Sequence, residues 1–63
     1  MRDIGLVVRK IRKECGLTQA ALSEKTKISR AHIASIESGA YSPTVKTLQR
    51  IADACGKQIK DFL

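Results

Sequence analysis

The stretch LTQAALSEKTKISRAHIASIESG, residues 17–39, decides the fold of this chain. It contains two short apolar runs, Ala21–Leu22 and Ile33–Ile36, separated by a polar step. Each run follows a hydroxyl residue, Thr18 or Ser29, of the type that caps helix N-termini. The stretch therefore predicts two short helices joined by a tight corner.

Helical periodicity continues on both sides of this stretch, and no segment alternates as a strand would. Apolar residues recur at helical spacing over residues 4–15, and Gly16 then follows as a helix-stop residue. Thr44 can cap a fourth helix that ends at Gly56, and a short fifth helix is expected from about Gln58. The chain is therefore predicted to be all-α, a compact fold of five short helices.

The length of the chain predicts a single domain over residues 1–63, built around one core. This core must be aliphatic, because Tyr41 and Phe62 are the only aromatic residues. The side chains expected on the inward faces of the helices are Ile4, Val7, Val8, Ile11, Cys15, Ala21, Leu22, Thr26, Ile33, Ile36, Val45, Leu48, Ile51, Ala52 and Cys55.

The chain is basic, with a net charge of +6 at pH 7 from 12 Lys and Arg against 6 Asp and Glu. Such a balance in a small domain favours an anionic partner: nucleic acid, an anionic membrane or an acidic protein. A merely solubilising surface is the alternative on charge alone. Because aromatic residues are so few, a stacking platform for single-stranded nucleic acid is not expected.

No run of residues approaches the ~18 apolar residues of a membrane-spanning helix. The first residues, Met1–Asp3, lack the apolar region of a signal peptide. We therefore expect a cytoplasmic, nucleoid-associated protein. Cys15 and Cys55 have neither zinc-ligand spacing nor the pattern of a disulfide framework. They are expected to be reduced thiols, and no metal or other cofactor is expected.

A tight corner between two short helices allows the first helix to hold the second away from the body of a protein. The major groove of B-DNA is about 12 Å wide and admits one α-helix. In helix-turn-helix proteins the first helix crosses the DNA backbone while the second enters this groove. The corner predicted within residues 17–39 suits this kind of binding.

Residues 9–56, RKIRKECGLTQAALSEKTKISRAHIASIESGAYSPTVKTLQRIADACG, resemble the Cro and lambda-repressor class of helix-turn-helix proteins, the XRE family. The resemblance extends over residues 4–63. Its marks occur in order and at family spacing, without a gap: Gly16–Gln19, Ile28–Arg30, Ile33, Ile36–Gly39, Pro43 and Leu48–Ala52. The resemblance implies a lambda-repressor-like DNA-binding domain whose second and third helices form the helix-turn-helix.

The resemblance also implies which residues meet DNA. The expected base-contacting residues are Ser29, Arg30, Ala31, His32 and Ser35. The expected phosphate-contacting residues are Gln19, Ser38, Tyr41 and Thr44. The unpaired N–H groups and the dipole of a helix's first turn favour anions there, and Arg30 can bind guanine bidentately. Without the resemblance, Arg30 and His32 read as solvated side chains, and Ser29 as a cap alone.

A partly buried ion pair between Arg12 and Glu37 is a further implication, since it would tie the third helix to the first. The corner departs from the family pattern. Lys27 stands where glycine is usual, so a left-handed conformation there would cost about 1 kcal/mol, or the corner is built differently. Ser23 and Thr26 likewise replace an alanine and an apolar residue. Arg9 is expected to be a solvated charge on the first helix.

These readings predict a sequence-specific transcriptional regulator, a repressor, that binds a near-palindromic operator in double-stranded DNA as a homodimer. Ile59 and Leu63 lie four residues apart and are expected on one face of the last helix, at the dimer interface. The resemblance implies that Phe62 faces the core. The alternative is an antitoxin that neutralises a partner protein and regulates its own synthesis, with Leu6 as an exposed contact. An enzyme is not expected, since His32 is the only histidine and no nucleophile–base set is evident.

Overall fold

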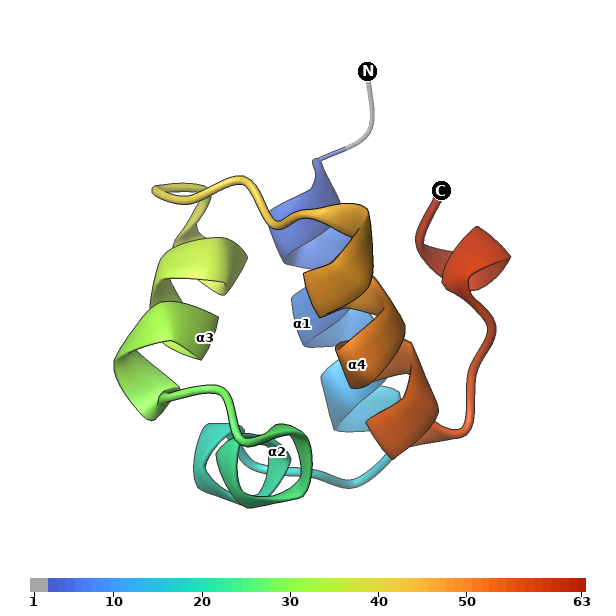
Figure 1. Ribbon diagram of the computed structural model, residues 1–63, viewed down its shortest axis with the longest axis horizontal. Coiled ribbons are helices and arrows are strands. Elements are labelled where there is room, and N and C mark those ends of the chain that lie inside the picture. The colour runs from blue at the N-terminus through green and yellow to red at the C-terminus, as the bar shows by residue number, and fades with distance from the viewer. Residues whose placement is uncertain (1–2) are drawn as a thin grey trace.

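The computed structural model describes residues 3–63, and within that range every element is helical. The elements are α1 (Ile4–Glu14), α2 (Gln19–Thr26), α3 (Arg30–Ser38), α4 (Val45–Cys55) and the 3-10 helix η1 (Ile59–Phe62). Figure 1 shows α2 lying across the base of the molecule, beneath α3 and α4. The prediction of an all-α fold is confirmed.

The predicted count of five helices is not confirmed, because the described residues form four α-helices and the last element is a single 3-10 turn. Its N–H groups bond three residues back, as in the 2.9 Å bond from Asp61 N to the Gln58 carbonyl. The Asp61 carboxylate in turn accepts the Gln58 backbone N–H at 2.9 Å. This reciprocal capping box closes one short turn, and the C-terminal segment then lies beside α4 (Figure 1).

Side-chain caps start the four α-helices where hydroxyl or carboxylate residues precede them. The predicted caps Thr18, Ser29 and Thr44 each accept the backbone N–H three residues further on, at 3.0 to 3.2 Å. Asp3 caps α1 in the same way, through bonds from two backbone N–H groups of its first turn. Asp3 was not predicted as a cap. Each cap fixes the direction in which its helix leaves the preceding loop.

The core is aliphatic, as expected, apart from one phenyl ring. Phe62 is fully buried, which confirms the inward position that the resemblance implied. Val45 was predicted to face the core and is instead 68% exposed, because the first turn of α4 extends past the core. The buried apolar residues are Val8, Ile11, Leu22, Ile28, Ile33, Ile36, Leu48, Ile51, Ala52 and Phe62.

Candidate nucleic-acid interface

The first turn of α3 presents an exposed polar surface. Ser29, Arg30 and Ala31 are exposed there, and His32 and Ser35 are half-buried. A shallow hollow forms beside this turn, lined by Ser29, Ala31, His32, Ser35, Ala40 and Tyr41. The structure therefore gathers four of the five expected base-contacting residues around one hollow, with Arg30 at the start of the same helix.

The ring of His32 is held in place by Tyr41. The two ring centroids lie 4.5 Å apart and the planes meet at 71°, an edge-to-face contact. His32 Nε2 is buried and has no hydrogen-bond partner within residues 3–63. The backbone N–H of Tyr41 donates to the Ser35 carbonyl at 3.1 Å, which ties the loop after α3 to the helix. His32 is thus a positioned side chain rather than a freely solvated one.

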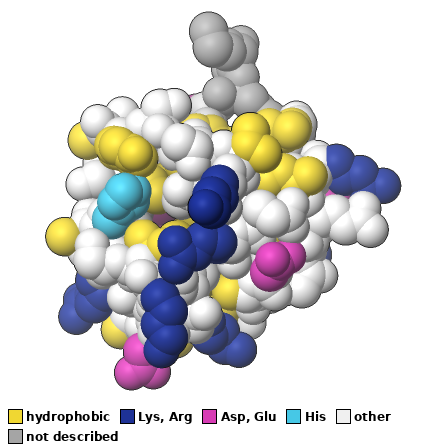
Figure 2. All heavy atoms as spheres, in the orientation of Figure 1, with side chains coloured by type: hydrophobic (Ala, Val, Ile, Leu, Met, Phe, Trp, Pro, Cys, Tyr) yellow, Lys and Arg dark blue, Asp and Glu magenta, His cyan; other side chains and the backbone are white. Residues whose placement is uncertain are grey.

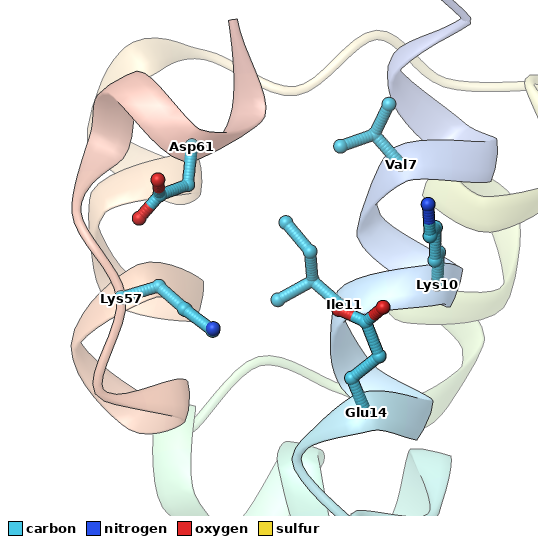
Figure 3. A pocket seen from close by; sticks show the side chains of 6 residues that line it. All are labelled: Val7, Lys10, Ile11, Glu14, Lys57 and Asp61. Carbon is cyan, nitrogen blue, oxygen red and sulfur yellow. The ribbon is translucent and has the colours of Figure 1, made fainter.

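Positive charge accompanies this surface. Figure 2 shows a line of Lys and Arg side chains running down the face on which the histidine lies, with few acidic side chains between them. A different hollow lies between α1 and the segment after α4 (Figure 3). Its charges balance, with Lys10 and Lys57 against Glu14 and Asp61 around an apolar floor. The α3 side is therefore the better site for a polyanion.

A further hollow at the junction of α1, α2 and α3 brings two expected phosphate-contacting residues together. Gln19 and Ser38 line it, together with Arg9. Arg9 is exposed and near enough to Glu37 to help lower the pKa of that carboxyl. Arg9 was expected to be a solvated charge. Arg9 precedes Arg12 by three residues, so the two side chains share a helix face. This spacing could have placed Arg9 near the ion pair of Arg12.

The ion pair between Arg12 and Glu37 joins α1 to α3 through two parallel contacts. Arg12 Nε lies 2.7 Å from Glu37 Oε2, and the Arg12 Nη2 group donates to Oε1 at 3.1 Å. The remaining Arg12 nitrogen donates to the Leu17 carbonyl at 2.8 Å. The two side chains are only 9% and 5% exposed. Both charges are thus buried and fully occupied by partners.

Gln19 supports this pair from α2. Its amide Nε2 donates to Glu37 Oε1 at 3.1 Å. Burial raises the pKa of the Glu37 carboxyl, but the hydrogen bonds from Arg12 and Gln19 outweigh that effect, so the pKa lies below its ordinary value of 4.5. The same carboxylate raises the pKa of Arg12. The start of α2 is thereby fixed against α3.

Gly5 permits the close approach of α1 to α3. A Cβ atom at Gly5 would lie 2.4 Å from the Ile36 carbonyl oxygen and 2.9 Å from that of Glu37. Both neighbours are backbone atoms, which cannot rotate aside. No role was predicted for Gly5, because a glycine inside a helical pattern carries no apolar signal of its own.

The corner between α2 and α3 keeps the left-handed conformation, although its residue is lysine. Lys27 has φ 62° and ψ 24°, and it is the one residue other than glycine with positive φ in the described range. Thr26 Oγ1 donates to the Leu22 carbonyl at 2.7 Å and accepts the Ile28 backbone N–H at 3.2 Å. Ser23 Oγ donates to the Ile28 carbonyl at 2.6 Å. The two unusual polar residues therefore form a linked set of hydrogen bonds across the turn.

An arginine from α4 also reaches this corner. The Arg50 guanidinium donates through Nη2 to the Thr26 carbonyl, one of the last carbonyls of α2. Helix C-termini leave such carbonyls without partners inside the helix, and they attract cations. Arg50 thus connects the helix-turn-helix to the rest of the fold.

The two residues expected at a dimer interface differ in their surroundings. Ile59 is half-buried and packs against the core, whereas Leu63 is 69% exposed. The shared helix face predicted for them depended on α-helical spacing, and that premise is wrong because η1 is a 3-10 helix ending at Phe62. Leu63 instead borders an apolar hollow with Ile4, Ser42, Pro43, Val45, Leu48 and Phe62.

These features define a helix-turn-helix domain: two capped helices at a left-handed corner, with an exposed first turn on the second. The helix-turn-helix family HTH_3, of the XRE type, matches residues 8–62, and the chain belongs to this family. It is 43% identical over 56 residues to the immunity repressor protein of Bacillus phage phi105, covering 89% of this chain and 39% of that protein.

Other relatives agree with this assignment. The chain is 42% identical over 52 residues to an HTH-type transcriptional regulator of Methanothermobacter thermautotrophicus, covering 82% of this chain and 75% of that protein. An HTH_3 family transcriptional regulator from Vibrio cholerae superposes with a TM-score of 0.90 at 33% identity. That match covers 95% of this chain and 34% of the Vibrio chain.

The fold also matches a much smaller protein. The restriction-modification controller protein C.AhdI from Aeromonas hydrophila superposes with a TM-score of 0.92 over 97% of this chain and 92% of its own, at 20% identity. At that identity the match bears on the fold alone. Among residues 3–63, no helix is long and apolar enough to cross a bilayer. The same residues contain no cluster of three potential metal ligands.

Proposed function

We propose that this chain is a sequence-specific regulator of transcription that binds double-stranded DNA through the major groove and acts as a repressor. The observation that carries the proposal is the exposed first turn of α3, Ser29 to Ala31, beside the hollow that His32 and Tyr41 line. The similarity to a phage immunity repressor supports the repressor assignment.

The proposed readout begins at the exposed N-terminus of α3. Arg30 is exposed and has no acidic partner among the described ion pairs, so its guanidinium would be available to bind guanine O6 and N7. Ala31 presents a methyl group that suits a thymine methyl. His32 and Ser35 lie further along, and the edge contact with Tyr41 limits the orientations that the imidazole can adopt. These residues would supply the sequence information.

Phosphate contacts are proposed around α3. Gln19 and Ser38 border one hollow, and Arg9 adds a positive charge to the same place. Tyr41 lines the separate hollow beside the first turn of α3, and Thr44 caps the start of α4. Such contacts fix the register of a protein on DNA but carry no sequence information themselves.

A homodimer on a near-palindromic operator completes the proposal, because one small module reads few base pairs. Leu63 remains a proposed interface residue, and Val45 joins it because both are exposed beside the same apolar hollow. Ile59 would contribute from the margin of this surface. Sedimentation equilibrium on wild type and on a Val45→Asp, Leu63→Asp double variant tests this, since both positions are too exposed to be needed by the core.

Selection of binding sites from random duplex DNA tests the main proposal and gives the operator and its symmetry. With ~4–6 phosphate contacts per protomer, log K should fall against log salt with a slope of about −4 to −5 per protomer. Arg30→Ala should relax preference at one or two base pairs and weaken binding by about 1–3 kcal/mol. Lys10→Ala is the matched control. It removes one positive charge at the hollow between α1 and the segment after α4, and it should leave the preferred bases unchanged.

Gln19→Ala should weaken all duplexes alike, because a phosphate contact is blind to sequence. A salt-independent interaction, or selection that recovers no preferred site, would refute the proposal. The antitoxin alternative requires a protein partner as well as DNA. It would be supported by a second, unrelated chain that co-purifies in a fixed ratio and remains bound after Arg30→Ala. The proposed setting for either function is the cytoplasm, at the nucleoid.

A further inference from the structure

Two cysteines that are far apart in the sequence meet at the end of the fold opposite the start of α4. Cys15 follows the last turn of α1, and Cys55 is the final residue of α4. The Cys15 thiol donates to the Cys55 carbonyl oxygen, with Sγ 3.3 Å from that oxygen. Both thiols are free and half-buried. The pair has no part in the DNA surface proposed above.

The surroundings give the two thiols different reactivity. Burial and, to a smaller extent, a side-chain hydrogen bond with Cys15 favour the protonated thiol and raise the pKa of Cys55 to about 11, against a smaller opposing effect of Lys57 and Lys25. Cys55 is therefore protonated at neutral pH and is a poor first nucleophile. Cys15 and Cys55 are both partly exposed, so a small oxidant can reach either thiol, and protonation rather than access distinguishes them. Attack by Cys15, followed by resolution by Cys55, is the order that this arrangement favours.

We propose that Cys15 and Cys55 form an oxidative modification site, at which a hydroperoxide converts the two thiols to one intramolecular disulfide. In the first step the Cys15 sulfur attacks the peroxide, the O–O bond breaks, and sulfenic acid and one water or alcohol form. In the second step the Cys55 sulfur attacks the Cys15 sulfur, the S–O bond breaks, and water leaves. Two thiols are oxidised by two electrons, and one peroxide is reduced.

The bridge would enclose α2, α3 and α4 in one covalent loop. A cross-link over a loop of this length reduces the entropy of the unfolded chain, so it stabilises the fold. It would join the end of α1 to the end of α4, and neither cysteine lines the hollow beside the first turn of α3. Oxidation is therefore expected to raise stability while leaving DNA affinity within about twofold.

The test treats the reduced protein with hydrogen peroxide and then measures intact mass, electrophoretic mobility without reductant, and the melting temperature. The expected result is a monomer about 2 Da lighter, with a melting temperature higher by about 10 °C, reversed by dithiothreitol. A disulfide-linked dimer, or stepwise gain of oxygen without loss of two hydrogens, would overturn the proposal. If the disulfide forms but the melting temperature does not change, the proposed stabilisation of the fold is wrong.

Single serine variants test the order of the two steps. Cys55→Ser should accumulate a sulfenic acid on Cys15 that dimedone traps, whereas Cys15→Ser should give little trapped product. Equal trapping in both variants would refute the assigned order. If either variant fails to fold, the mass and melting experiments on wild type still decide whether the bridge forms. DNA binding is measured on the oxidised wild type, so failure of the proposed function leaves the thiol result unaffected.

Discussion

The two ends of α3 are held in place by different kinds of interaction. Toward its C-terminal end, α3 meets α1 through a buried charged pair, Arg12 and Glu37, and through backbone contact at Gly5. At its N-terminal end the corner depends on hydroxyl groups and on a lysine in a left-handed conformation. One junction is close-packed and contains a buried ion pair, whereas the other is held by hydrogen bonds and contains backbone strain.

The difference predicts how each junction responds to change. A buried charge that loses its partner is left in a poorly solvating environment, so the charged junction should tolerate little substitution. The corner is held by several hydrogen bonds, so the loss of one leaves others in place. Its backbone strain can be relieved by a glycine at the left-handed position. Since α3 carries the proposed base contacts, both junctions control DNA binding by fixing the position of one helix.

Removing Glu37 should have the largest effect. Glu37→Ala leaves the Arg12 guanidinium buried without its carboxylate, and should lower the free energy of unfolding by about 3–5 kcal/mol in the absence of DNA. Urea denaturation measures this. Gln19→Ala is the matched control, because it removes one bond to the same carboxylate and leaves the ion pair. An unchanged denaturation midpoint for Glu37→Ala would show that the pair does not support the fold.

The pH dependence follows from the same carboxyl. Its pKa is lower in the folded than in the unfolded chain, so its stabilising contribution is complete above the unfolded value of about 4.5. That contribution should be lost as the pH falls below 4.5 and passes through the folded pKa. Glu37→Gln should remove this part of the acid dependence, which a series of denaturation curves between neutral and acid pH would reveal.

Enlarging Gly5 should have the next largest effect. Gly5→Ala places a methyl group within 2.4 Å of the Ile36 carbonyl oxygen, so α1 and α3 must move apart. Overpacking of this kind costs about 1–3 kcal/mol, and the displaced α3 should also bind its operator less tightly. Leu6→Ala, at the next position of the same helix, is the control, since Leu6 is 58% exposed. Equal stability of the two variants would contradict the close approach.

The ease of prediction from sequence also differs between the two junctions. Periodicity and capping residues located α2 and α3, because local signals determine both. The roles of Gly5 and Arg9 were missed, since a close backbone approach and a shared hollow arise only when distant segments meet. The meeting of Cys15 and Cys55 was missed for the same reason. Val45 was misplaced because periodicity alone does not show where a helix extends past the core.

The departures at the corner show a related limit. Ser23 and Thr26 each read as an isolated replacement of an apolar residue, and nothing in the sequence indicates that they bond to the same neighbour. In the structure, both contact the backbone of Ile28, one at its carbonyl and one at its N–H. The two polar residues therefore stabilise the same backbone segment together, and this is evident only from the three-dimensional structure.

A smaller effect is expected from Thr26→Val. Valine keeps the shape of threonine but removes the hydroxyl that accepts the Ile28 N–H, so the loss should be about 1–2 kcal/mol. Ser23→Ala is the control, because it removes the neighbouring bond to the Ile28 carbonyl from a less buried side chain. Thermal denaturation should rank wild type above Ser23→Ala and Ser23→Ala above Thr26→Val. The reverse order would assign the corner's stability to Ser23.

The smallest expected effect, and the one of opposite sign, is at Lys27. Lys27→Gly should raise the free energy of unfolding by up to about 1 kcal/mol, because glycine adopts φ 62° without the steric cost that a Cβ imposes. The gain is limited, since glycine also makes the unfolded chain more flexible. Lys27→Ala is the matched control, as it removes the same charge while retaining the Cβ. Both variants should bind DNA with the same salt dependence, and Lys27→Gly alone should melt at a higher temperature. If Lys27→Ala gains as much as Lys27→Gly, repulsion among the basic side chains, rather than backbone strain, limits the stability of the corner.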